Sequence, residues 1–250
     1  MAHQPTPTEA SEDEALARLL AEGGRRSTDA ESYGSSEDMV LERYGPADAP
    51  ALVLVHGGYF RPGVDRTHSR PQARALADEG WQVVLPEYRR VPGAPCTATE
   101  DLAAFDDHLQ ALGVDVRAWV GHSAGGTLAL WRALTPDLPP MRAVGLAAVS
   151  DFDAAVAERL GDDAVRDWIG RGPQDAPRLY SRLDPTRLLA ANPDGARRIH
   201  LVHGRDDETV PVGQSESFPA ETTLVTGAHH FDLIDPASRH WPAVVAAISG

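Results

Sequence analysis

The clearest chemical group in the sequence is Ser123, which lies at the centre of the pattern Gly-x-Ser-x-Gly formed with Gly121 and Gly125. An apolar run at 118–120 precedes this pattern, and a helix-like run at 127–134 follows it. A serine on a tight turn between a strand and a helix is presented as a nucleophile, and the glycines leave room for the turn to close. The start of the helix adds partial positive charge where an oxyanion would form. The pattern therefore predicts a serine nucleophile.

A serine hydroxyl is a weak nucleophile and needs a neighbouring base to take its proton. Two segments that each follow a predicted strand supply the remaining groups: one carries Asp206 and Asp207, and the other carries His229 and His230. Serine, then acid, then histidine is the chain order of α/β-hydrolase triads. We exclude His122 as the base because adjacent side chains on a sharp turn point apart. The spacing alone leaves both acids and both histidines open.

A glycine-rich loop, His56-Gly57-Gly58-Tyr59-Phe60, follows the apolar run at 51–55. Its glycines allow backbone N–H groups to turn toward a ligand without interference from side chains. Such donors stabilise the negative oxygen of a tetrahedral intermediate. We expect His56 to orient this loop rather than to act as a base.

Apolar runs and helical patterns alternate along the chain. Strands are predicted at 39–44, 51–55, 81–85, 117–120, 143–149, 198–203 and 222–226. Helices are predicted at 69–79, 99–112, 127–134 and 241–248. Unbroken apolar strands separated by helices indicate an α/β fold, with a mostly parallel sheet covered by helices on both faces.

Two segments depart from this alternation. Residues 1–37 are polar and acidic, and we expect a flexible segment or a short helix at 12–20 whose apolar face carries Ala15, Leu16, Leu19 and Leu20. The main domain is expected at 38–250. Within it, 151–194 has no strand signal, and we predict a small helical cap over the site, because long insertions at this edge of a sheet are usually functional. A surface elaboration that does not touch the substrate is the alternative.

Composition narrows the class of protein. The chain has 250 residues, a formal net charge of −14 and one cysteine, Cys96. The acidic balance argues against nucleic-acid or anionic-membrane partners, and a single cysteine allows no intrachain disulfide. The histidines lack metal-ligand spacing and no phosphate-loop pattern occurs, so we expect neither metal nor organic cofactor. With no signal-peptide pattern and no apolar run of about 18 residues, a cytoplasmic protein with a small-molecule partner is expected.

Five segments together resemble a known family: H-G-G-Y-F, L-P-E-Y-R, G-H-S-A-G-G, H-G-R-D-D-E-T-V-P and H-H-F-D-L. They are similar to serine esterases of the α/β-hydrolase fold, and among these to the kynurenine formamidase (arylformamidase) and related carboxylesterase branch. The resemblance extends from about Ala51 to the C-terminus. It implies an esterase or amidase of this fold that needs no cofactor.

Carried over residue by residue, the resemblance implies a triad of Ser123, Asp207 and His230, with Asp206 and His229 as the competing acid and base. It also implies that the oxyanion is held by the N–H groups of Gly58, Tyr59 and Ala124.

The segments around the site leave the substrate open. Phe60 stands where the formamidase loop usually has tryptophan, and Arg90 stands where the family has leucine. Phe60, Tyr88 and Trp168 are candidates for contact with the substrate. N-formylkynurenine, another aryl amide and a short-chain ester are the candidate substrates, and a non-catalytic ligand-binding protein on the same fold is the alternative class.

Overall fold

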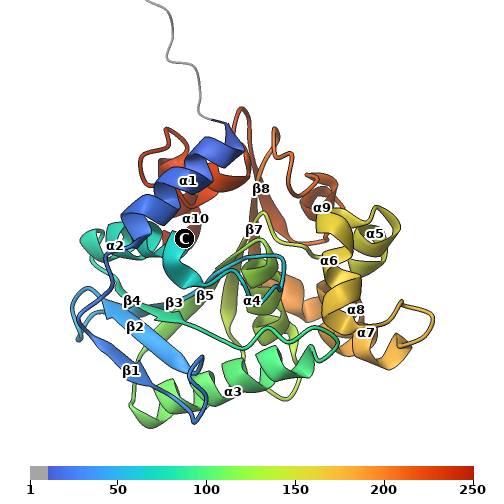
Figure 1. The fold of residues 1–250 in the computed structure, drawn as a ribbon, viewed down its shortest axis with the longest axis horizontal. Helices are drawn as coiled ribbons and strands as arrows, with labels where there is room; N and C mark the ends of the chain where they lie inside the picture. The colour runs from blue at the N-terminus through green and yellow to red at the C-terminus, as the bar shows by residue number, and fades with distance from the viewer. Residues whose placement is uncertain (1–10) are drawn as a thin grey trace, which may run out of the picture.

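The computed structural model describes residues 11–250 and contains one sheet with strand order β1-β2-β4-β3-β5-β6-β7-β8 (Figure 1). The strands are β1 (Ala30–Ser32), β2 (Val40–Tyr44), β3 (Ala51–Val55), β4 (Gln82–Pro86), β5 (Val116–His122), β6 (Arg142–Leu146), β7 (Ile199–Gly204) and β8 (Glu221–Val225). β2 runs antiparallel to both β1 and β4, and the remaining neighbours are parallel. The predicted mostly parallel sheet is confirmed.

Helices cover both faces of this sheet (Figure 1). They are α1 (Glu12–Gly23), α2 (Arg70–Asp78), α3 (Cys96–Ala111), α4 (Ala124–Leu134), α5 (Phe152–Ala157), α6 (Leu160–Ile169), α7 (Pro177–Leu183), α8 (Pro185–Ala191), α9 (Gly213–Glu216) and α10 (Trp241–Ser249). Short 3-10 helices lie at η1 (Arg66–Ser69), η2 (Pro193–Arg198) and η3 (His230–Leu233). Between residues 11 and 250, no helix combines the length and apolar character that a bilayer crossing requires.

The central strand β3 shows why the core has two halves. Leu52 and Leu54 pack into one apolar cluster with α1, α2 and α10, whereas Val53 and Val55 pack into the other with α3 and α4. Successive side chains of a strand point to opposite faces, so a strand that is buried on both faces must be apolar throughout. The continuous apolar run at 51–55 follows from this requirement.

Most predicted elements lie within a few residues of the observed ones; the helix predicted at 69–79, for example, is α2, which follows directly on the 3-10 turn η1. One element differs in a way that matters. The strand predicted at 143–149 ends at Leu146, because the backbone of Ala147 has a φ of 47° and leaves the sheet. Apolar residues therefore continue past the end of β6 into the loop that faces Ser123.

The N-terminal segment is ordered over much of its described part. α1 extends to Gly23 and buries Ala15 and Leu19, but Leu20, which we predicted on its apolar face, is 44% exposed. The buried stripe is narrow because Ala15 and Leu19 are one helical turn apart and Leu20 is rotated by about 100° from Leu19. β1 pairs with β2, so regular structure begins well before residue 38. Residues 1–10 of the predicted segment lie outside the described residues.

Candidate active site

Ser123 occupies the turn between β5 and α4 in a strained conformation, with φ of 54° and ψ of −123°. A non-glycine residue is held in this region only where its surroundings require it. The N–H of Ser123 donates to Leu146 O at 2.8 Å, which ties the turn to the end of β6. A Cβ atom on Gly125 would lie 2.2 Å from Val55 O, so this position accepts only glycine. The sequence pattern around the serine is thus a direct requirement of the turn.

Asp207 accepts donors on both carboxylate oxygens. Its Oδ1 accepts the N–H groups of Thr209 at 3.0 Å and Val210 at 2.7 Å. Its Oδ2 accepts Nδ1–H of His230 at 2.8 Å and lies 3.3 Å from Nε2 of His203. Burial raises the pKa of the Asp207 carboxyl, but the hydrogen bonds with His203 and His230 outweigh it and hold this pKa well below its usual range. The carboxylate is therefore ionised, and it fixes the orientation of the His230 ring.

The two competing residues lie elsewhere. The Asp206 side chain is exposed to solvent. His229 caps η3, where its Nδ1 accepts the N–H of Asp232 at 3.3 Å. The structure thus brings Asp207 and His230 into contact, and their part in a reaction stays a prediction.

The backbone of His230 is held on both sides. His122, excluded above as a base, donates from Nε2–H to His230 O at 3.1 Å, and the two ring centroids are 4.3 Å apart. Burial lowers the pKa of the His122 imidazole well below its usual value, which leaves it neutral. The N–H of His230 donates to Oε1 of Glu12 in α1 at 3.0 Å. No local sequence signal predicts either contact, because the partners are 108 and 218 positions apart.

The loop after β3 lies against Ser123. A Cβ atom on Gly57 would lie 2.8 Å from His122 O and 3.1 Å from Ser123 Cβ. Tyr59 follows with a φ of 56°, which is unusual for a residue with a side chain. Ala124 is the first residue of α4, where an amide has no intrahelical acceptor. The use of the Gly58, Tyr59 and Ala124 amides as oxyanion donors stays a prediction.

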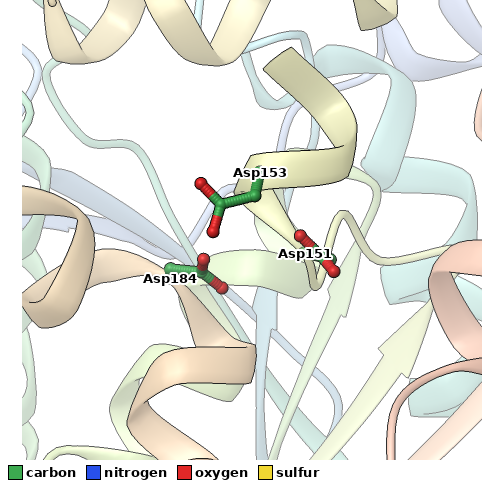
Figure 2. A group of neighbouring side chains, drawn as sticks. All are labelled: Asp151, Asp153 and Asp184. Atoms are coloured by element: carbon green, nitrogen blue, oxygen red, sulfur yellow. The ribbon is translucent and has the colours of Figure 1, made fainter. Parts of the chain in front are cut away.

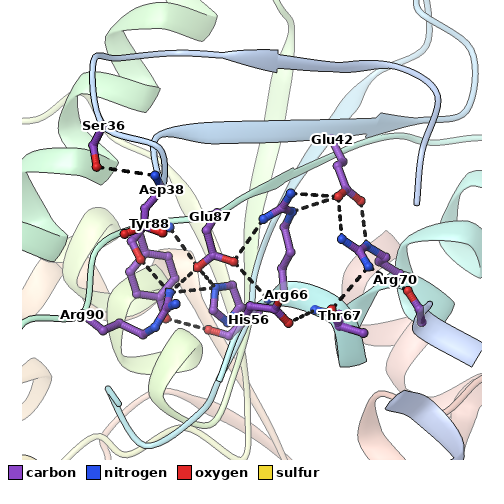
Figure 3. Close-up of polar contacts among 12 residues, drawn as sticks. Ser36, Asp38, Glu42, His56, Arg66, Thr67, Arg70, Glu87, Tyr88 and Arg90 are labelled. Carbon is purple, nitrogen blue, oxygen red and sulfur yellow. Dashed lines mark hydrogen bonds and ion pairs between the residues drawn. The ribbon is translucent and has the colours of Figure 1, made fainter. Parts of the chain in front are cut away.

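A buried network of charged groups supports this loop from behind (Figure 3). His56 donates from Nε2–H to Glu87 Oε1 at 3.0 Å, and the hydroxyl of Tyr88 donates to His56 O at 2.8 Å. Glu87 is also paired with Arg90 and, at 3.2 Å, with Arg66. Burial raises the pKa of Glu87, but His56 and Arg90 outweigh it and hold this pKa well below its usual range. His56 therefore has the supporting place that the sequence predicted.

The aromatic residues predicted to touch the substrate occupy different places. Phe60 lines the small cavity at Ser123. Trp168 is buried and stacks on Phe60 with ring centroids 4.1 Å apart, but it is not among the lining residues of that cavity. Tyr88 is a correction: it is fully buried and stacked on His56, because its hydroxyl is needed by the His56 carbonyl. Arg90 donates from Nε to Arg61 O at 3.1 Å, so it too supports the loop.

The cavity at Ser123 is small and apolar. It has about 20 Å³ of space open to the centre of a water molecule. Its lining residues are Tyr59, Phe60, Ser123, Ala124, Val149, Leu160, Ala164, Val165, Thr209 and Val210. Three of them come from α6, which Arg61 ties to the loop by donating to Gly161 O at 2.7 Å. The segment 151–194 forms helices α5 to α8 beside this cavity, and its function as a cap stays a prediction.

Three carboxylates at the base of this helical segment face one another (Figure 2): Asp151, Asp153 and Asp184. Their oxygens lie within 4.8 Å of one another. The guanidinium of Arg187 pairs with Asp153 at 2.6 Å and with Asp184 at 3.5 Å, so a side chain of the segment itself neutralises part of this charge. Burial and the charge of Asp151 raise the pKa of Asp184 to about 7. Asp151 and Asp184 cap the first turns of α5 and α8.

Comparison with known proteins identifies the family. The model of the family described as BD-FAE matches residues 38–221. The chain belongs to this family. It is 29% identical to the probable carboxylic ester hydrolase LipM of Mycobacterium tuberculosis, over 85% of the chain and 57% of LipM. It is also 34% identical to the magnesium-chelatase 30 kDa subunit of Rhodobacter capsulatus, over 67% of the chain and 74% of that subunit. The chain therefore spans little more than half the length of LipM.

Solved structures show the same fold. A putative thioesterase from Silicibacter sp. TM1040 superposes with a TM-score of 0.74 at 22% identity, covering 96% of this chain and 94% of its own. Esterase B from Lactobacillus rhamnosis superposes with a TM-score of 0.66 at 19% identity, covering 95% and 93%. These matches confirm the α/β-hydrolase fold. The similarity to LipM, which is named a probable carboxylic ester hydrolase, agrees with the predicted resemblance to esterases. The narrower resemblance to kynurenine formamidases stays a prediction.

Proposed function

We propose that this chain is a serine hydrolase that cleaves small carboxylic esters carrying a short acyl group, with Ser123, His230 and Asp207 as its triad. The observation that carries the proposal is the 2.8 Å contact between His230 Nδ1 and Asp207 Oδ2, at the sheet edge where Ser123 sits on its strained turn. The names of LipM and esterase B support the same chemistry.

The arrangement suits acyl transfer through a covalent intermediate. Ser123 Oγ attacks the carbonyl carbon of the ester while Nε2 of His230 takes its proton. The amides of Ala124, Gly58 and Tyr59 stabilise the negative oxygen of the tetrahedral intermediate. The intermediate collapses and releases the alcohol, which receives the proton from His230. Water then attacks the acyl-enzyme by the same steps and releases the acid.

Asp207 contributes without exchanging the proton. Its ionised carboxylate accepts Nδ1–H of His230, which leaves Nε2 as the ring nitrogen that can take the proton of the serine. The negative charge also stabilises the imidazolium that forms when the ring takes the proton. The depressed pKa of Asp207 keeps the carboxylate charged through this step.

The narrow apolar cavity supports a short acyl group. Leu160 and Val165 of α6, together with Val210, line about 20 Å³ of space at Ser123, which favours a short acyl group over a long one. A formyl group also fits such a space, which supports aryl formamides, N-formylkynurenine among them, as the second candidate substrate. A long acyl chain would require α6 to move away.

A series of substrates tests the acyl preference. We expect kcat/KM to be highest for p-nitrophenyl acetate and to fall at least about tenfold from the butyrate to the octanoate ester, because the cavity rejects added methylene groups. N-formylkynurenine is assayed beside them. A higher kcat/KM for N-formylkynurenine than for acetate would assign the chain to the formamidases, and a preference for octanoate would contradict the short-acyl proposal.

Reactivity of the serine separates an enzyme from a binding protein. A fluorophosphonate probe should label the wild-type protein, and Ser123→Ala should abolish labelling and lower kcat by about 10⁶. His230→Ala should be nearly as inactive, whereas the matched variant His229→Ala should keep most of its activity. Failure of the wild-type protein to label would favour the non-catalytic alternative, and activity lost only in His229→Ala would move the base to His229.

A further inference from the structure

The first residue of α1 connects two loops of the active site. Oε1 of Glu12 accepts the N–H of Glu208 at 3.0 Å and the N–H of His230 at 3.0 Å. Oε2 of Glu12 accepts the hydroxyl of Thr209 at 2.5 Å. One carboxylate thus binds the loop that carries Asp207 and the loop that carries His230. We call this carboxylate with its three donors the Glu12 bridge.

The Glu12 bridge lies next to the contact between Asp207 and His230, for which the two loops must be correctly placed relative to each other. Thr209 donates its backbone N–H to Asp207 and its side-chain hydroxyl to Glu12, so the two carboxylates share a partner. His230 donates Nδ1–H to Asp207 and its backbone N–H to Glu12. Hydrogen bonds to a charged acceptor are roughly twice as strong as neutral ones. Glu12 therefore holds His230 directly and holds the loop that carries Asp207 through Glu208 and Thr209.

Docking of α1 fixes the position of Glu12. Ala15 and Leu19 are buried in the interface, and Arg70 donates to Gly23 O at 2.8 Å at the far end of the helix. Arg18 forms an ion pair with Asp235, which is buried just beyond η3. The helix thus meets the histidine loop at two points one to two turns apart, and Glu12 is anchored through the helix rather than by its own side chain alone.

We propose that Glu12 is a positioning residue that sets the His230 imidazole for proton transfer, acting from a helix outside the residues matched by the BD-FAE family. The inference rests on the proposed function. The carboxylate of Glu12 accepts from the backbone N–H groups of Glu208 and His230 and from the hydroxyl of Thr209. Its effect passes through the backbone of His230 and the side chain of Thr209.

Three variants of α1 test the role. Glu12→Ala removes the whole bridge and should lower kcat for p-nitrophenyl acetate about tenfold with KM nearly unchanged, because the cavity is intact but the imidazole is misplaced. Glu12→Gln keeps one acceptor oxygen and should recover part of the loss, to about threefold below wild type. Glu14→Ala is the matched control, since Glu14 lies in the same turn and caps the N–H of Ser11.

Equal kcat in Glu12→Ala and wild type would overturn the proposal, and so would an equal loss in Glu14→Ala, since that would reflect fraying of α1. Circular dichroism verifies folding of each variant, and Glu12→Gln carries the test if Glu12→Ala does not fold. Amide hydrogen exchange needs no substrate: exchange at His230 should quicken about tenfold in Glu12→Ala and stay unchanged in Glu14→Ala. Unchanged exchange at His230 in Glu12→Ala would contradict the bridge. If exchange quickens in Glu12→Ala but the wild-type protein is inactive and is not labelled by the probe, only the proposed function is contradicted.

Discussion

The two sides of Ser123 are supported in different ways. One side is the loop at 56–60, the predicted source of oxyanion donors, which we call the oxyanion side. This loop is supported by Glu87, His56 and Arg90, which are all buried and lie within 35 positions of one another in the sequence. The other side consists of the loops that carry Asp207 and His230, which we call the histidine side. It is supported by His122, by His203 and by a partly exposed Glu12. The contacts of Glu12 join segments 196 to 218 positions apart.

The difference concerns how firmly each side is fixed. Removing one partner of a buried ion network leaves another charge uncompensated, which costs about 3–5 kcal/mol, so the oxyanion side is held as one unit. The Glu12 carboxylate remains partly accessible to water, so losing it leaves its donors to be solvated instead. A single substitution should therefore disturb the whole oxyanion side, whereas substitutions on the histidine side should have graded effects.

The largest effect in this comparison is expected at Asp207, the carboxylate that accepts Nδ1–H of His230. Asp207→Asn should lower kcat by about 10⁴, because an amide at this position disturbs both the tautomer and the charge that His230 needs. Asp206→Asn, at the adjacent exposed position, is the control and should remain near wild type. A large loss confined to Asp206→Asn would transfer the acid to Asp206 and refute the geometric assignment.

A smaller but still large effect is expected on the oxyanion side. Glu87→Gln keeps the shape but leaves Arg90 without its counter-charge and His56 without its carboxylate partner, so the loop should shift and kcat should fall by about 10²–10³. Glu79→Gln, at an exposed position after α2, is the control. Unchanged kcat in Glu87→Gln would show that the network does not support catalysis.

The same substitution predicts a pH dependence of stability. The folded state holds the pKa of Glu87 below its ordinary value of 4.5, so its stabilising contribution is present above that pH and is lost as the pH falls below it. The Tm of the wild-type protein should therefore fall more steeply than the Tm of Glu87→Gln as the pH is lowered into the acid range. Parallel curves for the two proteins would contradict the assigned shift.

The smallest effect is expected at a buried carboxylate with weaker pairing. The pKa of Asp184 is raised from 3.8 to about 7, so ionising it costs stability as the pH rises through this window. Asp184→Asn retains the acceptor for Thr186 N–H and should raise Tm at pH 8, by roughly 2–4 °C for each kcal/mol gained, with little change at pH 4. Asp153→Asn, an exposed member of the same cluster, should show no such gain. A lower Tm for Asp184→Asn at pH 8 would mean that its pairing with Arg187 outweighs burial.

The sequence by itself determined the architecture and the turn that carries Ser123. Alternating apolar runs and helical patterns predicted the mostly parallel sheet, because burial on both faces forces a strand such as 51–55 to be apolar throughout. The pattern around Ser123 predicted the strained turn, because only glycine fits where Gly125 meets Val55 O. These features are local, so they can be recognised along the chain.

Only the tertiary structure decided which side chains support these groups. The residues alone left Asp206 and Asp207 open, and the structure shows that Asp207 is the one that meets His230. It also shows that Tyr88, predicted to contact the substrate, instead donates its hydroxyl to the His56 carbonyl. Glu12, from a segment we predicted as flexible or as a short helix, accepts the N–H of His230. The physical reason is that a carboxylate is paired by whichever donors its loop conformation brings within about 3 Å, and donors separated by some 200 positions leave no periodic trace in a sequence.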